Sequence, residues 1–207
     1  MNRLVILAGG KSTRMGTDKM FLKTEGKTFI ERIYCNASYC FDEIFISTDS
    51  EVHADKIRTL IPEAKIVIDS YKEIGPVGGL LSVYEETGAD GFAVTAVDTP
   101  FMLPELLLHL KEECKGAALM LKIADKLEPL TAYYSEEALK LFARAVADGH
   151  YSIISALYDN YDTITIEKII ENHDDLSKQE IEKAIMNINT KKEYEALHET
   201  SSNTSGA

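Results

Sequence analysis

A short apolar run that stops abruptly at two glycines is the feature of this chain that most limits its fold. Residues 3–8 are rich in Val, Ile and Leu, and Gly9 and Gly10 follow at once. A run of this length and composition is typical of a strand buried on both faces of a parallel sheet, and the glycines mark its end. We therefore expect the chain to begin with a central strand that opens into a loop.

The loop after this strand has the local features of a phosphate-binding site. Its two glycines leave backbone N–H groups open to a close ligand, and Lys11, Arg14 and Lys19 supply three cations. The alternative is a plain turn with solvated lysines, because glycine is also common in turns for steric reasons. Together with the strand before it, the loop predicts binding of a nucleotide.

Two well-known phosphate motifs do not fit this loop. A P-loop would need glycine at the position of Val5, five residues before Gly10. The dinucleotide fingerprint G-x-G-x-x-G also fails, because Gly9 and Gly10 are adjacent and the next residues are Lys, Ser and Thr. The loop therefore points to a nucleotide-binding class other than these two.

Charge is distributed unevenly along the chain. The net charge is −12, yet residues 1–35 hold seven Lys and Arg against three Asp and Glu. An acidic protein body disfavours a nucleic-acid-binding surface, whereas a local positive region can attract a small anion. We expect a small phosphorylated substrate and no nucleic-acid partner.

The sequence also bears on the compartment. No segment approaches the roughly twenty apolar residues of a membrane span, and Arg3 precedes only five apolar residues, too few for a signal peptide. Cys35, Cys40 and Cys114 form no C-x-x-C site. We expect a cytoplasmic protein with reduced thiols and no membrane partner.

Strand-like and helix-like patterns alternate up to about residue 125. The expected strands are 3–8, 43–48, 65–69, 91–97 and 117–121, and the expected helices are 28–39, 53–60, 78–86 and 104–113. Such alternation predicts an α/β fold with a mostly parallel sheet and helices on both faces.

The rhythm changes in the last third of the chain. We expect strands at 130–134 and 162–167 and helices at 136–147, 177–185 and 191–198. Residues 201–207 are small and polar, which predicts a disordered tail. Residues 1–200 are expected to form a single domain.

Ligands of such sheets bind where parallel strands end. Gly9 follows the first expected strand, 47–49 follows the second, Asp69 ends the third and Asp98 follows the fourth. The four strand ends should meet at one crevice, and three of them bring a carboxylate.

These residues suit phosphate chemistry. Asp98 can hold Mg²⁺, which takes one or two carboxylates together with substrate phosphates, although an N-cap is its alternative role. Lys19 can neutralise charge on an attacked phosphate, or it is a solvated surface lysine. Asp69 can accept hydrogen bonds from the two N–H groups of a guanine edge, or it caps a turn.

Histidine gives no comparable signal. The five histidines are scattered without the spacing of metal ligands, so we assign them no role. They are His53, His109, His150, His173 and His198.

The segment from Leu7 to Gly16, followed by Asp18 and Lys19, resembles the signature of nucleotidyltransferases that attach a nucleoside monophosphate to a substrate. The Asp-Lys ending, where many sugar and alcohol members have Pro-Lys, is similar to that of the molybdenum cofactor guanylyltransferases, a MobA-like nucleotidyltransferase family. Further similar segments follow in the same order at 68–70, 75–82, 98–100, 128–130 and 187–190.

The resemblance implies a Rossmann-like nucleotidyltransferase fold and an Mg²⁺-dependent enzyme that transfers GMP from GTP to molybdenum-bound molybdopterin, releasing pyrophosphate. It implies a nucleotide-binding N-terminal part, an acceptor-binding C-terminal part, and contact with molybdoenzymes or cofactor-delivery proteins. By family position, catalysis falls to Lys19, Asp98 and Arg14, the metal to Asp98, the acceptor to Asn187 and Asn189, and the nucleotide to Leu7, Ala8, Gly9, Gly10, Lys19, Ser47, Asp69 and Asp98.

The sequence departs from the family pattern at three places. Ser47 stands where the family usually has asparagine, which leaves base choice open. Lys191 and Lys192 stand where a Pro-Glu pair is common, and residues 150–186 have no match. The alternatives are a nucleotidyltransferase that uses CTP or another NTP on a different phosphorylated acceptor, and a non-catalytic nucleotide-binding protein.

Overall fold

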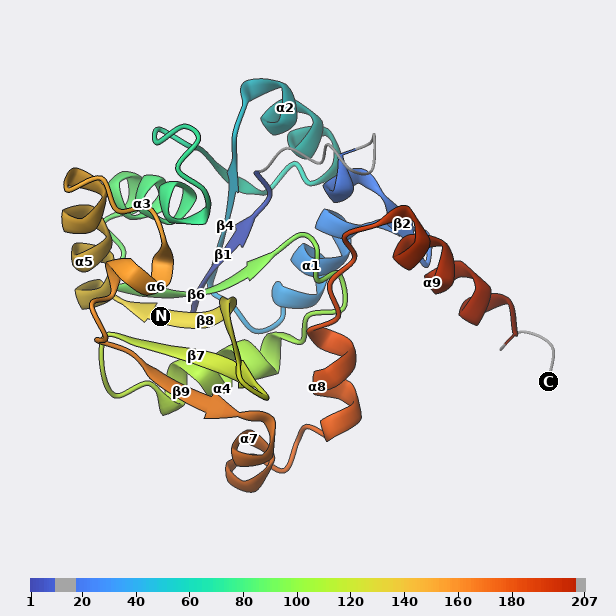
Figure 1. Cartoon of the computed structure of the whole chain (residues 1–207). Helices are drawn as coiled ribbons and strands as arrows, with labels where there is room; N and C mark the ends of the chain where they lie inside the picture. Colours follow the sequence, from blue (N-terminus) through green and yellow to red (C-terminus); the bar gives the residue numbers. More distant parts are fainter. Residues whose placement is uncertain (10–17, 204–207) are drawn as a thin grey trace.

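The structure is a computed structural model that describes residues 1–9 and 18–203. A sheet of seven strands in the order β5-β4-β1-β6-β8-β7-β9 forms its centre (Figure 1). The strands are β1 (Arg3–Leu7), β4 (Glu43–Thr48), β5 (Lys65–Ile68), β6 (Gly91–Ala96), β7 (Ala118–Ile123), β8 (Lys126–Ser135) and β9 (Asp162–Thr165). Only β8 runs opposite to the other six strands of this sheet, so the predicted mostly parallel α/β fold is confirmed.

Alternating side chains of the strands divide the core into two layers. In β1, Leu4 and Ile6 belong to one buried cluster, and Val5 and Leu7 belong to the other. This two-residue period is the geometry of a strand whose two faces are both covered. It explains why β1 is apolar throughout rather than alternating with polar residues.

Helices cover both faces (Figure 1). On the face of Leu4 and Ile6 lie α1 (Phe29–Ala37), α2 (Glu51–Leu60), α4 (Pro104–Glu113), α7 (Ile166–Asn172) and α8 (Lys178–Ala184). On the opposite face lie α3 (Pro76–Thr87), α5 (Glu136–Ala147) and α6 (Ile153–Ala156). The remaining elements are the short helix η1 (Lys19–Phe21), the hairpin β2 (Lys23–Thr24) and β3 (Lys27–Thr28), and the C-terminal helix α9 (Lys191–Asn203).

Strand order also determines where a ligand can bind. β1 is hydrogen-bonded to β4 on one side and to β6 on the other, and both pairs are parallel. After β1 the chain forms β4 and β5 on one side of β1, and it later forms β6 on the other side. Such a switch point opens a crevice at the strand ends.

The predicted elements up to residue 147 lie within two residues of the observed ones, except for the strand expected at 130–134. That strand is β8, which extends over Lys126–Ser135 because it pairs with both β6 and β7. The short helix η1, the hairpin of β2 and β3, and the helices α6 and α7 were not predicted.

The C-terminal part of the chain differs more from the predicted elements. The strand expected at 162–167 ends at Thr165. Thr165 is the N-cap of α7, and its hydroxyl accepts a hydrogen bond from the N–H of Lys168 at 3.3 Å. Helix α9 includes residues 201–203, which were predicted to be disordered, while 204–207 lie outside the described residues. Within the described part of the chain, none of the helices is both long and apolar enough to cross a membrane.

Candidate active site

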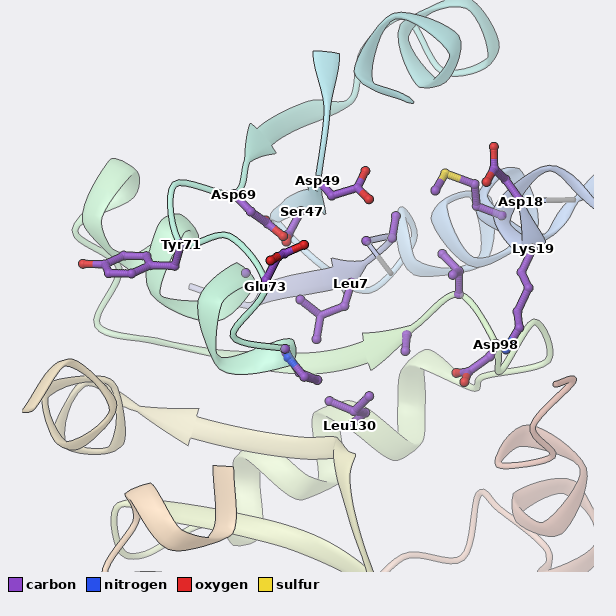
Figure 2. Close-up of a pocket in the computed structure, with 18 of the residues that line it drawn as sticks. Leu7, Asp18, Lys19, Ser47, Asp49, Asp69, Tyr71, Glu73, Asp98 and Leu130 are labelled. Carbon is purple, nitrogen blue, oxygen red and sulfur yellow. The ribbon is translucent and has the colours of Figure 1, made fainter. Parts of the chain in front are cut away.

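A cavity of about 1090 Å³ opens at the carboxyl ends of the parallel strands (Figure 2). All four predicted strand ends contribute to it, so the expected convergence is confirmed. The site residues predicted from sequence that line it are Leu7, Ala8, Gly9, Lys19, Ser47, Asp69, Asp98 and Asn189. Asn187 instead lines an adjoining pocket of about 300 Å³ that shares Asp98 and Asn189 with the cavity. Gly10 and Arg14 lie outside the described residues.

One end of the cavity is built around Asp69. Its backbone N–H donates to the carbonyl oxygen of Thr48 at 2.8 Å, which extends the β5–β4 ladder by one bond. Its Oδ1 accepts a hydrogen bond from Ser47 Oγ at 2.6 Å. Burial raises the pKa of Asp69 above the usual aspartate value, although the bond from Ser47 and the charge of Lys72 oppose the rise. The result is a carboxylate held in one orientation at the rim of the sheet.

Helix α3 approaches this end closely because residue 79 is glycine. A Cβ atom on Gly79 would lie 2.4 Å from Ser47 Oγ and 2.9 Å from Leu7 Cδ2. Both distances are shorter than contacts that real Cβ atoms make. The glycine therefore lets the start of α3 pack directly on the Ser47–Asp69 pair.

The other end of the cavity contains Asp98 and Lys19. Figure 2 shows the side chain of Lys19 extending toward Asp98. Burial raises the pKa of Asp98, and the positive charge of Lys19 acts against that rise. The carbonyl oxygen of Asp98 accepts a hydrogen bond from the N–H of Ile188 at 2.8 Å, which fixes the 187–190 segment beside it.

Asn189 completes this end. Lys19 Nζ donates to Asn189 Oδ1 at 2.5 Å. The backbone N–H groups of Asn189 and Thr190 both donate to Glu193 Oε2, at 2.6 and 2.8 Å, at the start of α9. Lys19 and the C-terminal asparagine motif, far apart in sequence, thus meet in the fold.

The residues around Asp98 fit a divalent metal of the hard class. The carboxylate is partly removed from water, and Glu128 adds a second negative charge that further raises the pKa of Asp98. A bound cation would offset both effects. Mg²⁺ commonly takes one or two protein carboxylates and completes its coordination with water and phosphate oxygens. Asp98 has the donor chemistry for that role.

Sequence reasoning missed His53. Its Nδ1 lies 2.7 Å from Asp49 Oδ1 and its Nε2 lies 3.1 Å from Asp18 Oδ2. It therefore links the residue before Lys19 to the strand end after β4. The only sequence signal was the four-residue spacing from Asp49 to His53, and such a spacing is common at helix N-termini.

The loop from β5 to α3 was also missed. Tyr71, Lys72 and Glu73 from this loop line the cavity. Lys72 Nζ donates to the carbonyl oxygen of Asp49 at 2.7 Å, which ties the loop to the neighbouring strand end. No periodic pattern identified these residues, because a loop has none.

Sequence comparisons show which known proteins this chain is similar to. Residues 4–163 match the family described as MobA-like NTP transferase domain. A protein of Aquifex aeolicus named "probable molybdenum cofactor guanylyltransferase" is 28% identical over 95% of this chain and 90% of its own length. A Clostridium perfringens protein of the same name is 32% identical over 93% of each chain.

A solved structure resembles the whole fold. It is the crystal structure of molybdopterin-guanine dinucleotide biosynthesis protein A from Archaeoglobus fulgidus, with a TM-score of 0.81 and 29% identity. The similarity covers 97% of this chain and 99% of that one. The predicted Rossmann-like nucleotidyltransferase fold is confirmed, and the chain belongs to the MobA-like NTP transferase family that its motifs resemble.

Proposed function

We propose that this protein transfers GMP from GTP to molybdenum-bound molybdopterin and releases pyrophosphate. The observation that carries the proposal is the division of one cavity into two ends. Asp69 and Ser47 form one end, and Lys19, Asp98 and Asn189 form the other. A nucleoside triphosphate needs both kinds of surroundings, hydrogen-bond acceptors for its base and cations for its phosphates.

Asp69 supports a choice of guanine. Guanine presents N1–H and the exocyclic N–H₂ on one edge, and a carboxylate can accept from both. Cytosine presents one donor group beside two acceptors on the corresponding edge, so it would place an acceptor against Asp69. Ser47 donates to Oδ1 and thereby holds the carboxylate in place. The serine in place of the usual asparagine is therefore compatible with guanine.

The phosphate end supports nucleotidyl transfer. An oxygen of the acceptor phosphate would attack the α-phosphorus of GTP, forming one P–O bond as the bond to the β-phosphate oxygen breaks and pyrophosphate leaves. Lys19 would offset the negative charge on the phosphate oxygens during this exchange. Asp98 would hold Mg²⁺, which supplies further charge neutralisation when bound. The backbone of Leu7, Ala8 and Gly9 would contact the nucleotide at the end of β1.

The adjoining pocket is where we expect the acceptor to bind. It is lined by Asn187, Asn189 and Glu128 and meets the main cavity at Asp98. An acceptor in this pocket would present its phosphate beside Asp98 and Lys19. Amide side chains such as Asn187 can both donate to and accept from the polar edge of a pterin.

The test is pyrophosphate release with Mg²⁺ and molybdenum-loaded molybdopterin, with GTP, CTP, ATP and UTP in separate reactions. We expect release with GTP alone. Release with CTP instead would keep the mechanism and overturn the assignment of the base. No release with any of the four would contradict the proposed acceptor or the enzyme itself. Equilibrium binding of each nucleotide with Mg²⁺ then separates these two outcomes.

A further inference from the structure

A cluster of histidine and carboxylate side chains joins helices α4 and α7. His109 and Glu112 lie on α4, and His173 is the C-cap residue directly after α7. One potential ligand atom from each of the three residues lies within 4.8 Å of the other two. None of these residues lines the active-site cavity or the pocket beside it. The cluster is therefore separate from the nucleotidyltransfer site.

His109 has one nitrogen engaged and one directed into the cluster. Its Nε2 lies 2.8 and 3.0 Å from the two carboxylate oxygens of Asp175, so the chemistry of the pair places the proton on Nε2. Its Nδ1 is buried, has no hydrogen-bond partner among the described residues, and lies 3.7 Å from Glu112 Oε2. Metal-binding histidines commonly show this pattern, one nitrogen donating to a carboxylate while the other binds the metal.

His173 presents a second nitrogen of the same kind. Its Nε2 is buried and makes no hydrogen bond within the described part of the chain, although Glu113 Oε1 lies 3.3 Å away. The same oxygen also accepts a hydrogen bond from Asn172 Nδ2 at 3.0 Å. Buried nitrogens without partners are costly, so two in one cluster point to a missing ligand. A cation that accepts nitrogen lone pairs would satisfy both.

We propose that His109, His173 and Glu112 bind one divalent transition metal of the Zn²⁺ class, which joins α7 to α4. Two imidazoles and a carboxylate are an established Zn²⁺ ligand set, whereas Mg²⁺ prefers oxygen ligands alone. The site therefore differs in chemistry from Asp98 and stands whether or not the proposed reaction is correct.

Binding requires a local rearrangement. The rings of His109 and His173 are stacked, with centroids 3.6 Å apart and planes at 19°. An ion bound in the plane of each ring at about 2.0–2.1 Å cannot serve two rings in that stack. One ring must turn out of the stack toward Glu112. The metal would then replace a ring contact with a coordinate bond between the two helices.

The experiment uses metal-free full-length protein titrated with Co²⁺, whose tetrahedral complexes absorb visible light, followed by displacement with Zn²⁺. The Asp98→Asn variant serves as the background, because it removes the carboxylate proposed for the active-site metal. We expect one Co²⁺ per chain with a tetrahedral spectrum. In the same background, His109→Gln, His173→Gln and Glu112→Gln should each weaken binding by at least about tenfold.

His150→Gln is the matched control, because His150 is an exposed histidine outside the cluster. It should bind Co²⁺ as the background protein does. Melting temperatures of the metal-free variants identify any that fail to fold, and Zn²⁺ should raise the melting temperature of the background protein more than that of His173→Gln. The proposal is overturned if the background protein binds no Co²⁺ in tetrahedral form. It is equally overturned if folded His109→Gln and His173→Gln bind the ion unchanged.

Discussion

Lys19 and Asn189 are joined by a hydrogen bond from Nζ to Oδ1 across 170 residues of sequence. The cation that follows the glycine loop is thus oriented by the segment that precedes the last helix. This relationship gives Asn189 a role in addition to the acceptor contact proposed for it. It gives the C-terminal segment an influence on the phosphate end of the site.

Lys19→Ala should lower kcat/KM for GTP by at least about tenfold, because it removes the charge-assisted contact proposed for the phosphates. Asn189→Ala should have a smaller effect, because the charge of Lys19 remains and only its orientation is lost. The double variant should be no worse than Lys19→Ala in the GTP-dependent step. Steady-state kinetics on the three variants checks this coupling, and fully additive losses would show that the two side chains act independently.

Asp98→Asn should reduce transfer by about a hundredfold or more, because it removes the proposed metal carboxylate. The folded protein should melt at the same temperature or higher, because burial of the carboxylate raises its pKa and so opposes the charged form in the fold. Activity and thermal unfolding are measured on the same preparation. Substantial Mg²⁺-dependent activity in this variant would contradict the role of Asp98.

Acid should weaken GTP binding through Asp69. Burial raises the pKa of this carboxyl above its usual value of 3.8, so it takes up a proton at a higher pH than a solvated aspartate and then loses an acceptor. KM for GTP should rise as pH falls through that raised pKa. The sign for stability is opposite, because a group that binds its proton more tightly in the fold stabilises it below that pKa and loses this contribution as pH rises.

Two variants test this assignment of the pH profile. Ser47→Ala removes the hydrogen bond that lowers the pKa of Asp69, so the rise in KM should begin at a higher pH. Asp69→Asn should weaken GTP binding and lose this pH dependence. A profile that is the same in all three proteins would assign the titration to another group.

Gly79→Ala should impair nucleotide binding, because its Cβ would clash with Ser47 Oγ and Leu7 Cδ2. The start of α3 or the Ser47 side chain must shift, so we expect KM for GTP to rise at least about tenfold. Gly116→Ala is the matched control, since its Cβ would meet only Asp162 Oδ2 at 3.4 Å. Equal binding by both variants would show that the site tolerates the shift.

The strand ends could be predicted because their signals are local. The apolar run of β1, its two following glycines and the aspartates at 69 and 98 can each be found within a few residues of sequence. The rule that parallel strands share one ligand-binding edge then brings Asp69 and Asp98 to the same cavity. Helix boundaries up to 147 followed equally from local caps and periodicity.

Partnerships between distant residues could not be predicted. Ser47 pairs with a carboxylate 22 positions away, and nothing beside Ser47 in the chain indicates that partner. His109 and His173 are brought together only by the packing of α4 and α7, so their spacing carried no signal. The length of β8 likewise depends on pairing with two strands and not on its own sequence.

The bond between Lys19 and Asn189 has a consequence for the order of assembly. Synthesis runs from the N-terminus, so the lysine is made 170 residues before its partner. Tyr194 of α9 then fastens the late segment to the early hairpin, donating its hydroxyl to the carbonyl oxygen of Lys23 at 2.8 Å. Although the central strands can pair while the chain is still growing, the end of the site that holds Lys19 is completed only after Asn189 and Tyr194 have been synthesised. A nascent chain would therefore hold the Asp69 carboxylate, with its bond from Ser47, before it holds an oriented lysine.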